Sequence, residues 1–495
     1  MSLRTIHDFE LALLDPCLAM SSQGIPVDEA RRAAMLADLD AMRAPLLDEV
    51  RTIVLPRLAA AKRLPKPHLF RALWTCPCCR GGAAKVAACW SCAGFATKPG
   101  KRALSASGRT LAPCRVCAGE GKRSTLAFNP NSPEQVGIVL YDVLRLPQRV
   151  KGSKPTVDEE ALKSLRPYDA LGVVERLLTV TKAGTMRAIL ERIAPAPDGR
   201  IRTFYNPAGT ETGRFSSSES FLVPSTNLQN LPKREAATDP RFEVRACLVP
   251  DEGCVLVEAD LSGAEAWVTM ALVGDHETLD RMRRGEDIHA WTAMHLYELP
   301  SLAAVTPTYR VMGKTARHAL DRGMQWKKFM SEVNSMADRT GLSVTPSEAQ
   351  RIVAAYHRLH PLLVPWWRKV QDELSRTHRL TTCFGRTRTF FDRGQETWLS
   401  SVHLDALAYV PQSTVGDLLN RGLLRWWRQH DGKLGDVRMQ VHDSVVLVVP
   451  RAKAPLAAAR LRAALTEPIT VNGITLTIPV DVTVGERWNA MEGVR

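Results

Sequence analysis

The sequence predicts a multidomain α+β protein, and three observations support this fold class. Helical periodicity dominates up to residue 200 and returns in a long stretch between two strand-like regions, CVLVEADLSG and VRMQVHDSVVLVVP. A cysteine-rich, basic segment interrupts the first helical region. A chain of 495 residues is too long for one simple core, so roughly two to four subdomains are expected.

The segments before residue 200 are expected to be mainly helical. Apolar residues recur at intervals of three and four over residues 7–53, with a break at QGIP. Helical signals resume at NSPEQVGIVLYDVL, where Asn131 could serve as the N-cap, and at DEEALKSL. Between these two segments VKGSKPT reads as a basic, flexible loop, and residues 169–194 read as a further helix.

The cysteine-rich segment is expected to be an insertion that binds structural zinc. Two Cys-x-x-Cys turns supply four thiolates, which complete a tetrahedral zinc shell and leave no open position for catalysis. Three such pairs cannot be divided evenly into four-cysteine sites. The segment could therefore bind one or two ions, and the sequence does not decide which pairs share an ion. Reduced thiols in a loop are the alternative, and disulfides are disfavoured without a secretory signal. The pairs are Cys76–Cys79, Cys89–Cys92 and Cys114–Cys117.

The positive charge of the chain is concentrated around the same segment. The formal net charge is +14, and the stretch from Lys62 to Arg123 holds thirteen Lys and Arg residues and one acid, Glu120, which gives +12. A segment with so large an excess of positive charge favours a nucleic-acid partner over an ordinary solvated surface. The sequence shows no apolar run of about 18 residues and no secretory signal, so a cytoplasmic location without a membrane partner is expected.

Two strand-like runs each end in a carboxylate. CVLVEADLSG reads as a buried strand ending at Asp260, and VRMQVHDSVVLVVP reads as a hairpin with Asp443 near its tip. Two carboxylates brought close together repel, but two Mg²⁺ ions bound between them reverse that cost. One ion then lowers the pKa of an attacking hydroxyl and the other stabilises a leaving pyrophosphate. The alternative is that both residues are ordinary turn acids.

Basic residues recur at every fourth position in YRVMGKTARHALDRGM. On a helix, Arg310, Lys314, His318 and Arg322 would lie along one face. Like charges at this spacing repel by roughly a few tenths of a kcal/mol per pair. A polyanionic ligand such as a triphosphate would account for such a stripe.

Four ordered segments carry the most specific motifs in the chain: TETGRFSSSESFLVPSTNLQNLP, VEADLSGAEAW, RVMGKTARHALDRGM and QVHDSVVLVVP. They resemble the T-x-T-G-R signature and motifs A, B and C of family A DNA polymerases, the group of bacterial DNA polymerase I and many phage replicative enzymes. Weaker similarities, among them GIPVDEAR and EDIHAWTA, extend the resemblance over the whole chain apart from the insertion.

The resemblance implies a right-hand fold with an antiparallel sheet in the palm, helical fingers and a helical thumb. The zinc-binding insertion would lie within the thumb. The expected boundaries are thumb 1–75 and 124–200, zinc-binding insertion 76–123, palm 201–275 and 399–495, and fingers 276–398.

The resemblance also implies a DNA polymerase that extends primers on template DNA with dNTPs by two-metal-ion nucleotidyl transfer. Asp260 and Asp443 match the magnesium-binding pair. Glu265 matches the residue that crowds the sugar 2′ position and so selects deoxyribonucleotides. The remaining nucleotide contacts would be His289, Arg310, Lys314, His318 and Arg322.

Contacts with primer-template DNA follow from the same resemblance. Arg214, Gln412 and His442 match residues that touch the primer terminus and the minor groove of the new base pair. Asn227 and Gln229 fall where the family contacts the DNA backbone. Read as isolated residues, they would more often be structural or solvated, and Gln412 would then be a simple cap.

The chain departs from the family pattern inside these motifs. His318 stands where the family has an aromatic residue, Ala319 replaces a glycine, and Arg322 replaces a tyrosine, whereas Gly323 is kept. Ser444 stands in place of the glutamate of motif C. The expectation is that His318 and Arg322 contact the nucleotide or the template through charge and hydrogen bonds.

Further expectations concern the partners and the biological setting. The chain is expected to be of phage type, to act in a bacterial host cell, and to have no proofreading exonuclease domain of its own. A separate exonuclease or a processivity factor would then be a partner. The alternatives are a catalytically impaired DNA-binding or scaffold protein of the same fold, a polymerase with unusual nucleotide or template selectivity, and an RNA-synthesising or reverse-transcribing relative.

Overall fold

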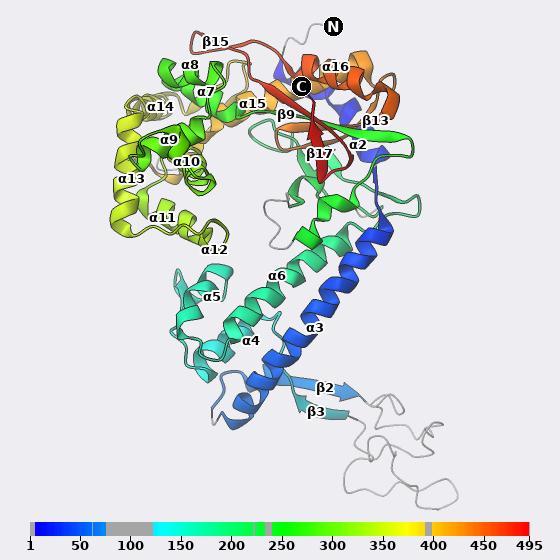
Figure 1. The fold of residues 1–495 in the computed structure, drawn as a ribbon, viewed down its shortest axis with the longest axis vertical. Helices are drawn as coiled ribbons and strands as arrows, with labels where there is room; N and C mark the ends of the chain where they lie inside the picture. The colour runs from blue at the N-terminus through cyan, green and yellow to red at the C-terminus, as the bar shows by residue number, and fades with distance from the viewer. Residues whose placement is uncertain are drawn as a thin grey trace, which may run out of the picture. The chain divides into compact units, whose positions relative to one another are not determined.

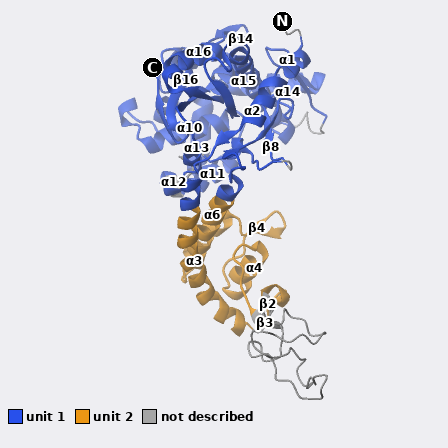
Figure 2. Ribbon diagram, turned by 90° about the vertical axis from the view of Figure 1, so that its right-hand side faces the viewer, with its two compact units in different colours: residues 1–35, 189–495 blue, residues 36–188 orange. Residues whose placement is uncertain are grey.

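The computed structural model describes residues 5–61, 63–75, 122–220, 223–232, 240–391 and 398–494 (Figure 1). Two compact units make up the chain: unit 1 comprises residues 1–35 and 189–495, and unit 2 comprises residues 36–188 (Figure 2). Helices α3 (Glu29–Ala60) and α6 (Val173–Arg192) both cross the boundary between them. Within the described ranges, no helix combines the length and the apolar character needed to cross a membrane.

Unit 1 is built around a five-stranded antiparallel sheet in the order β12-β13-β9-β16-β17. Its central strand, β9, has Val255, Val257 and Ala259 on the face buried in the main apolar core. Helix α16 packs on β9 and β16, and α15 packs on α16. The bounds are β9 (Cys254–Leu261), β12 (Asp436–Val441), β13 (Ser444–Pro450), β16 (Val480–Arg487), β17 (Ala490–Gly493), α15 (Ser401–His430) and α16 (Ala454–Leu465).

The two strand predictions are confirmed by this sheet. The expected buried strand is β9, and the expected hairpin consists of β12 and β13, joined by a two-residue turn. Six of the seven residues of β13 are buried. This burial on both faces explains the unbroken apolar run VVLVV that follows Ser444.

A block of helices lies between β9 and α15 in the sequence. Asp275, Asp287, Thr306 and Thr345 cap four of them with side chains that accept hydrogen bonds from the first turn. The bounds are α7 (Ala264–Val273), α8 (His276–Arg283), α9 (Ile288–Leu296), α10 (Pro307–Leu320), α11 (Trp326–Ser335), α12 (Ala337–Thr340), α13 (Pro346–Leu359) and α14 (Leu363–Thr377).

Helix α10 carries the basic stripe and packs closely on α9. Gly313 makes this approach possible, because a Cβ atom there would lie 2.1 Å from the carbonyl oxygen of His289. The helix ends at Leu320, so Arg310, Lys314 and His318 lie on it and Arg322 lies in the turn that follows. The expectation of one helical stripe is therefore corrected at its last residue.

The remaining described elements of unit 1 are short. Besides several 3-10 turns, they include two N-terminal helices and four small antiparallel pairs of strands. The bounds are α1 (Ile6–Ala12), α2 (Leu14–Gln23), β1 (Ile25–Pro26) with β6 (Arg200–Ile201), β7 (Phe204–Asn206) with β8 (Ser216–Ser218), β10 (Arg379–Thr381) with β11 (Thr387–Thr389), and β14 (Ile469–Val471) with β15 (Ile474–Leu476).

Unit 2 has its own apolar core, to which Val54, Phe70, Leu140 and Leu177 contribute. Besides its parts of α3 and α6, its described residues include two short α-helices, a π-helical turn (Ile138–Val143), two 3-10 turns (Pro67–Phe70 and Arg166–Tyr168) and two antiparallel strand pairs. The bounds are α4 (Pro133–Gly137), α5 (Glu159–Leu165), β2 (Arg71–Thr75) with β3 (Lys122–Leu126), and β4 (Val150–Lys151) with β5 (Lys154–Pro155).

Two local expectations for unit 2 are corrected. The N-cap of α4 is Ser132, whose hydroxyl accepts a hydrogen bond from the amide of Gln135, and not Asn131. The segment VKGSKPT, expected to be a loop, contains the β4–β5 pair. The six paired cysteines lie outside the described residues, so the zinc site stays a prediction.

Candidate active site

Asp260 and Asp443 lie at one end of the central sheet. Asp260 is near the end of β9, directly opposite Ser444 of β13, and Asp443 occupies the turn that precedes Ser444. The amide of Leu261 donates to the carbonyl oxygen of Asp443 over 3.1 Å, which ties the turn to β9. Both aspartates line one cavity of about 380 Å³. The structure thus brings the two predicted acids together.

The turn that carries Asp443 contains backbone strain. His442, the first of its two residues, has φ 54°, in the left-handed region that a non-glycine residue enters at a cost of roughly 1–2 kcal/mol. Gln440 supports the turn by donating to the carbonyl oxygen of His442. Gln229 in turn donates to the side chain of Gln440 over 2.7 Å. A set of side-chain contacts therefore holds this strained turn.

The acids of this cavity suit magnesium. Mg²⁺ prefers hard oxygen ligands and commonly takes one or two carboxylates, with waters and substrate phosphates completing its shell. Asp260 and Asp443 provide such a pair in an open cavity. Within the described ranges, this site included, no group of three or more His, Cys, Asp or Glu side chains is arranged to hold a metal ion, so the protein's share of the coordination would be these two carboxylates. Asp260 and Asp443 therefore fit magnesium ions whose remaining ligands would be water and substrate phosphates.

Glu265, in the first turn of α7, lies between two arginines. One nitrogen of Arg214, Nη2, donates to Glu265 Oε1 over 2.7 Å and to Asp443 Oδ1 over 2.9 Å. Arg322 forms an ion pair with the other oxygen of Glu265. Burial, and then the charge of Arg214, lower the pKa of Arg322. Motif matching did not predict this pairing, because the three residues come from separate segments of the sequence.

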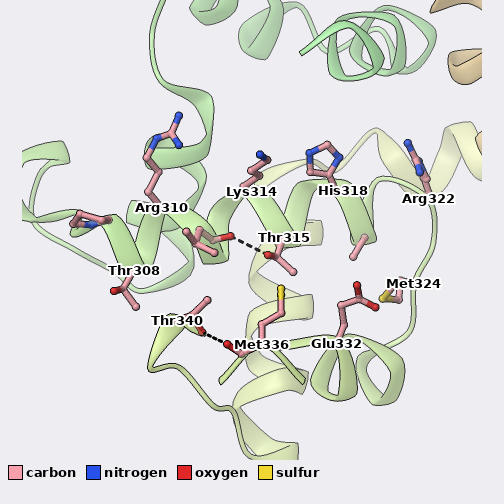
Figure 3. A pocket seen from close by; sticks show the side chains of 13 residues that line it. Thr308, Arg310, Lys314, Thr315, His318, Arg322, Met324, Glu332, Met336 and Thr340 are labelled. Atoms are coloured by element: carbon pink, nitrogen blue, oxygen red, sulfur yellow. Dashed lines mark hydrogen bonds between the residues drawn. The ribbon is translucent and has the colours of Figure 1, made fainter. Parts of the chain in front are cut away.

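The basic side chains on and after α10 stand in a row and point to the same side, as Figure 3 shows. Together with residues of α11 and α12 they line a second cavity of about 760 Å³. Lys314, His318 and Arg322 also line the cavity that holds the two aspartates. These three side chains therefore form a wall shared by both cavities, whereas Arg310 lines only the larger one.

Arg310 is held by a residue that the sequence analysis did not single out. Asp287, the N-cap of α9, accepts hydrogen bonds from the amides of His289 and Ala290, both over 3.0 Å, and forms an ion pair with Arg310. Asp287 lies just before the first turn of an apolar helix, a sequence position typical of N-caps. An anion that binds Arg310 would have to compete with this carboxylate.

The two histidines of the cavity carry little positive charge at neutral pH. Burial, followed by the charges of Arg317, His318 and Arg310, lowers the pKa of His289 to about 4. Burial and Lys314 lower the pKa of His318. The two rings lie 6.2 Å apart between centroids. Their neutral imidazoles offer hydrogen bonds, and the charge of the stripe comes from Arg310, Lys314 and Arg322.

The opposite face of α10 is fixed by a buried polar network. The side chain of Arg317 is 2% exposed, and its Nη1 lies 3.2 Å from His360 Nε2. His360 Nδ1 lies 2.9 Å from Asp275 Oδ2. Both contacts are satisfied when His360 is neutral, donates from Nδ1 and accepts at Nε2. The Tyr356 hydroxyl donates to Asp321, which follows α10.

The residues expected to touch DNA are placed as follows. Asn227 accepts a hydrogen bond from the amide of Gln229 over 3.1 Å and donates to the carbonyl oxygen of Ser217 over 2.9 Å. Gln412 lies within α15 and is partly exposed. Arg214 lies at the two carboxylates described above, and His442 lies beside Asp443.

Motif C differs from the family at Ser444, and the structure shows what that residue contacts. Its hydroxyl donates to Glu258 Oε1 over 2.7 Å. The indole of Trp488 donates to the other oxygen of Glu258 over 3.1 Å. Glu258 lies on β9, two residues before Asp260, and was not among the predicted site residues. Its carboxylate is thus held by two donors beside the turn that carries Asp443.

The chain is similar to known polymerases over most of its length. The family model for DNA polymerase family A matches residues 116–490. The thermostable DNA polymerase I of Thermus aquaticus is 30% identical over 374 residues, which cover 73% of this chain and 42% of that protein. The DNA polymerase I of Pseudomonas aeruginosa is 28% identical over 374 residues, covering 73% of this chain and 38% of that protein. The chain thus matches about two fifths of the length of these relatives.

A solved structure shows the same fold. The POL domain of Pol1 from M. smegmatis, in complex with DNA primer-template and dNTP, superposes with a TM-score of 0.71 at 20% identity, covering 97% of this chain and 70% of that one. With the family match over residues 116–490, the conclusion is that this chain belongs to DNA polymerase family A.

Proposed function

We propose that this chain is a DNA-directed DNA polymerase that extends a primer 3′ end with dNTPs on a DNA template. The observation that carries the proposal is the shared cavity. It brings the two sheet-end aspartates, Asp260 and Asp443, together with Lys314 and Glu265 in a chain of family A. The solved relative, whose title names primer-template DNA and dNTP, supports the same choice of substrates.

The chemistry follows from the residues of the cavity. Asp260 and Asp443 would hold two Mg²⁺ ions, which supply activation of the primer 3′-hydroxyl and charge stabilisation of the leaving pyrophosphate. Lys314 and Arg310 would bind the triphosphate, with Arg310 exchanging Asp287 for phosphate oxygens. His289 and His318, both neutral, would donate hydrogen bonds, and Glu265 would crowd the sugar 2′ position.

Primer-template DNA is the proposed second partner. Arg214, Gln412 and His442 would contact the primer terminus and the minor groove, and Asn227 and Gln229 the DNA backbone. The palm would comprise 201–275 and 399–495, the fingers 276–398, and the thumb 1–75 and 124–200. The cysteine-rich segment would bind one or two structural zinc ions and contact either DNA or a processivity factor.

Primer extension with purified protein tests the central proposal. We expect Mg²⁺-dependent addition of dNTPs, and a rate lowered on the order of a thousand-fold or more by Asp260→Asn or Asp443→Asn. Glu492→Gln removes an exposed acid on β17 of the same sheet and serves as the matched control, with activity close to that of the wild type. Extension that persists in Asp443→Ala would contradict the metal assignment.

The same assay separates the alternatives. A catalytically impaired DNA-binding protein would bind primer-template DNA without extending it, and an RNA-synthesising relative would prefer NTPs. Unusual nucleotide selectivity has a specific observation in its favour. The Glu265 carboxylate is paired with Arg322, a residue that stands where the family has tyrosine.

A further inference from the structure

We propose that Arg322 is a positioning residue for sugar discrimination: it fixes the Glu265 carboxylate in the nucleotide cavity and so sets how strictly a ribonucleotide is rejected. The proposal rests on the polymerase function proposed above. It differs from the sequence-based expectation, in which Arg322 contacts the nucleotide or the template directly. In the structure Arg322 acts on the protein's own carboxylate.

The first step concerns the freedom of Glu265. A glutamate side chain has several accessible rotamers, and a carboxylate can exclude a 2′-hydroxyl only if it stays in one place. Glu265 is 18% exposed, and each of its two oxygens faces a different arginine. Rotation of the carboxylate would break the contact of at least one oxygen with its arginine. The two arginines together therefore hold the carboxylate in position.

The second step is that Arg214 cannot hold Glu265 alone. The same Nη2 atom that donates to Glu265 also donates to Asp443. Arg214 is therefore shared between the sugar-facing acid and an acid of the proposed magnesium pair. It is also the residue proposed to touch the primer terminus. The ion pair between Arg322 and Glu265, in contrast, does not involve Asp443.

The third step concerns the support of Arg322 itself. Its neighbour Asp321 is anchored by the Tyr356 hydroxyl at its side chain and by the Trp367 indole, which donates to its carbonyl oxygen over 3.1 Å. The next residue, Gly323, has φ +77°, and a Cβ atom there would lie 2.8 Å from Leu399. The turn that presents Arg322 is therefore held on both sides, as a positioning role requires.

The test compares dNTP and NTP incorporation by the full chain on a primer-template, measured as kcat/KM for each. In Arg322→Met we expect the dNTP/NTP ratio to fall about 10- to 100-fold, because Glu265 is released. Arg322→Lys keeps the charge without the planar fork and should lie between Met and the wild type. Arg322→Tyr, which offers a hydroxyl donor to Glu265, should recover most of the ratio.

Arg310→Met is the matched control, since it removes another arginine of the same row. It should lower kcat/KM for dNTP and NTP alike, because the triphosphate is common to both, and leave the ratio unchanged. A double-mutant cycle adds a second control. Arg322→Met should change the ratio little in a Glu265→Ala background, because its effect passes through that carboxylate.

Several outcomes would overturn the inference. One is an unchanged ratio in Arg322→Met with a normal melting temperature. Another is an equal loss for both sugars, and a third is an effect fully additive with Glu265→Ala. If Arg322→Met fails to fold, the dNTP/NTP ratios of Arg322→Lys and Arg322→Tyr are compared with that of the wild type instead. Wild-type protein that extends no primer with dNTPs would instead contradict the proposed function, which keeps the two failures distinct.

Discussion

At the scale of single residues, the surroundings of His289 decide which form of its imidazole the cavity contains. The ring is partly buried and surrounded by cationic side chains, and its pKa is lowered to about 4. At neutral pH it is therefore a neutral hydrogen-bond donor. A bound triphosphate would place negative charge beside it and favour the protonated form.

The first prediction is that the pKa of His289 rises when nucleotide binds. NMR of the imidazole should show titration near pH 4 in the free protein and a higher value with a non-hydrolysable dNTP analogue and Mg²⁺. His289→Gln identifies the signal, because the resonance that this variant lacks belongs to His289. A free-protein value for His289 near 6.5 would contradict the burial argument.

The same shift links stability to pH. The folded-state pKa of His289 lies below the ordinary value of about 6.5 expected in the unfolded chain. The unfolded state therefore binds the proton more readily, so this contribution to stability is present above about pH 6.5 and is lost as the pH falls toward 4. His289→Gln should flatten the pH dependence of the unfolding free energy in that window.

Residue identities in the cavity could be predicted from motifs, but their pairings could not. Asp260, Glu265, Lys314 and Asp443 line one cavity as their motif positions suggest. The ion pair of Arg322 with Glu265 joins two segments that carry no mutual signal in a single sequence. Such pairs depend on the tertiary fold, which brings the ends of α7 and α10 together.

At the scale of elements, α10 has two faces with different tasks. One carries Arg310, which lines the larger cavity, and Lys314 and His318, which line both cavities. The other carries Arg317, buried in a polar network with His360 and Asp275. A buried charge whose partner is removed is strongly destabilising, so this network holds the helix in one position.

The second face yields a further prediction. Arg317→Met should lower the unfolding free energy by about 3 kcal/mol, because Asp321 and the rest of the network lose their buried cation. It should also raise KM for dNTPs several-fold without changing the dNTP/NTP ratio, since α10 is less well fixed while Glu265 keeps both partners. Urea unfolding and steady-state kinetics measure the two effects.

Arg310→Met is the stability control for this experiment. Its ion pair with Asp287 is exposed, 49% and 41% for the two side chains, and such pairs contribute at most about 1 kcal/mol. A destabilisation by Arg317→Met no larger than that of Arg310→Met would show that the buried network does not fix α10.

Strands were easier to predict than helix ends. The apolar runs VLV of β9 and VVLVV of β13 identified these strands, and β12 was identified as the other arm of the hairpin; most residues of all three are buried. The periodicity of the basic stripe continued past Leu320, whereas the helix stops there and Gly323 takes a positive φ. The contacts of Asp321 with Tyr356 and Trp367 favour that ending and are invisible in the sequence.

At the scale of the whole molecule, unit 2 offers a clean place to separate the cysteine-rich segment. Thr75 and Lys122 are paired at the end of the β2–β3 ladder. A two-residue Asn-Gly turn can close an antiparallel pair at such a position. Residues 76–121 can therefore be replaced without opening the ladder.

The last prediction uses this replacement. The shortened chain should keep its fold and its single-nucleotide incorporation at saturating DNA, and it should lose the one or two zinc ions measured by elemental analysis. The removed segment holds seven Lys and Arg residues and one Glu. If it grips DNA, processivity should fall, and the dependence of DNA affinity on salt should become shallower by several units of slope.

The outcome distinguishes the two roles considered for the segment. Unchanged processivity and salt dependence of the isolated enzyme would indicate that it docks a partner instead. A matched control replaces each of the six paired cysteines with serine and leaves the charge in place. That variant should lose zinc, and comparing it with the deletion separates metal from charge.

Family membership could be predicted for most of the chain, whereas the division into two units could not. Four ordered motifs span unit 1, and the family match extends over 116–490. The boundary at residues 35 and 188 falls inside α3 and α6. Within a continuous helix neither the periodicity nor the composition of the sequence changes, so the sequence contains no signal for a boundary there.

The left-handed backbone of His442 has a consequence for engineering. Glycine would adopt φ 54° without the penalty that a histidine incurs there. A search that optimises stability alone would therefore tend to replace this residue, and it would count the replacement as an improvement. The turn would survive, but the side chain next to Asp443 would be gone. Thermostabilised versions of this protein should therefore be designed with His442 held constant.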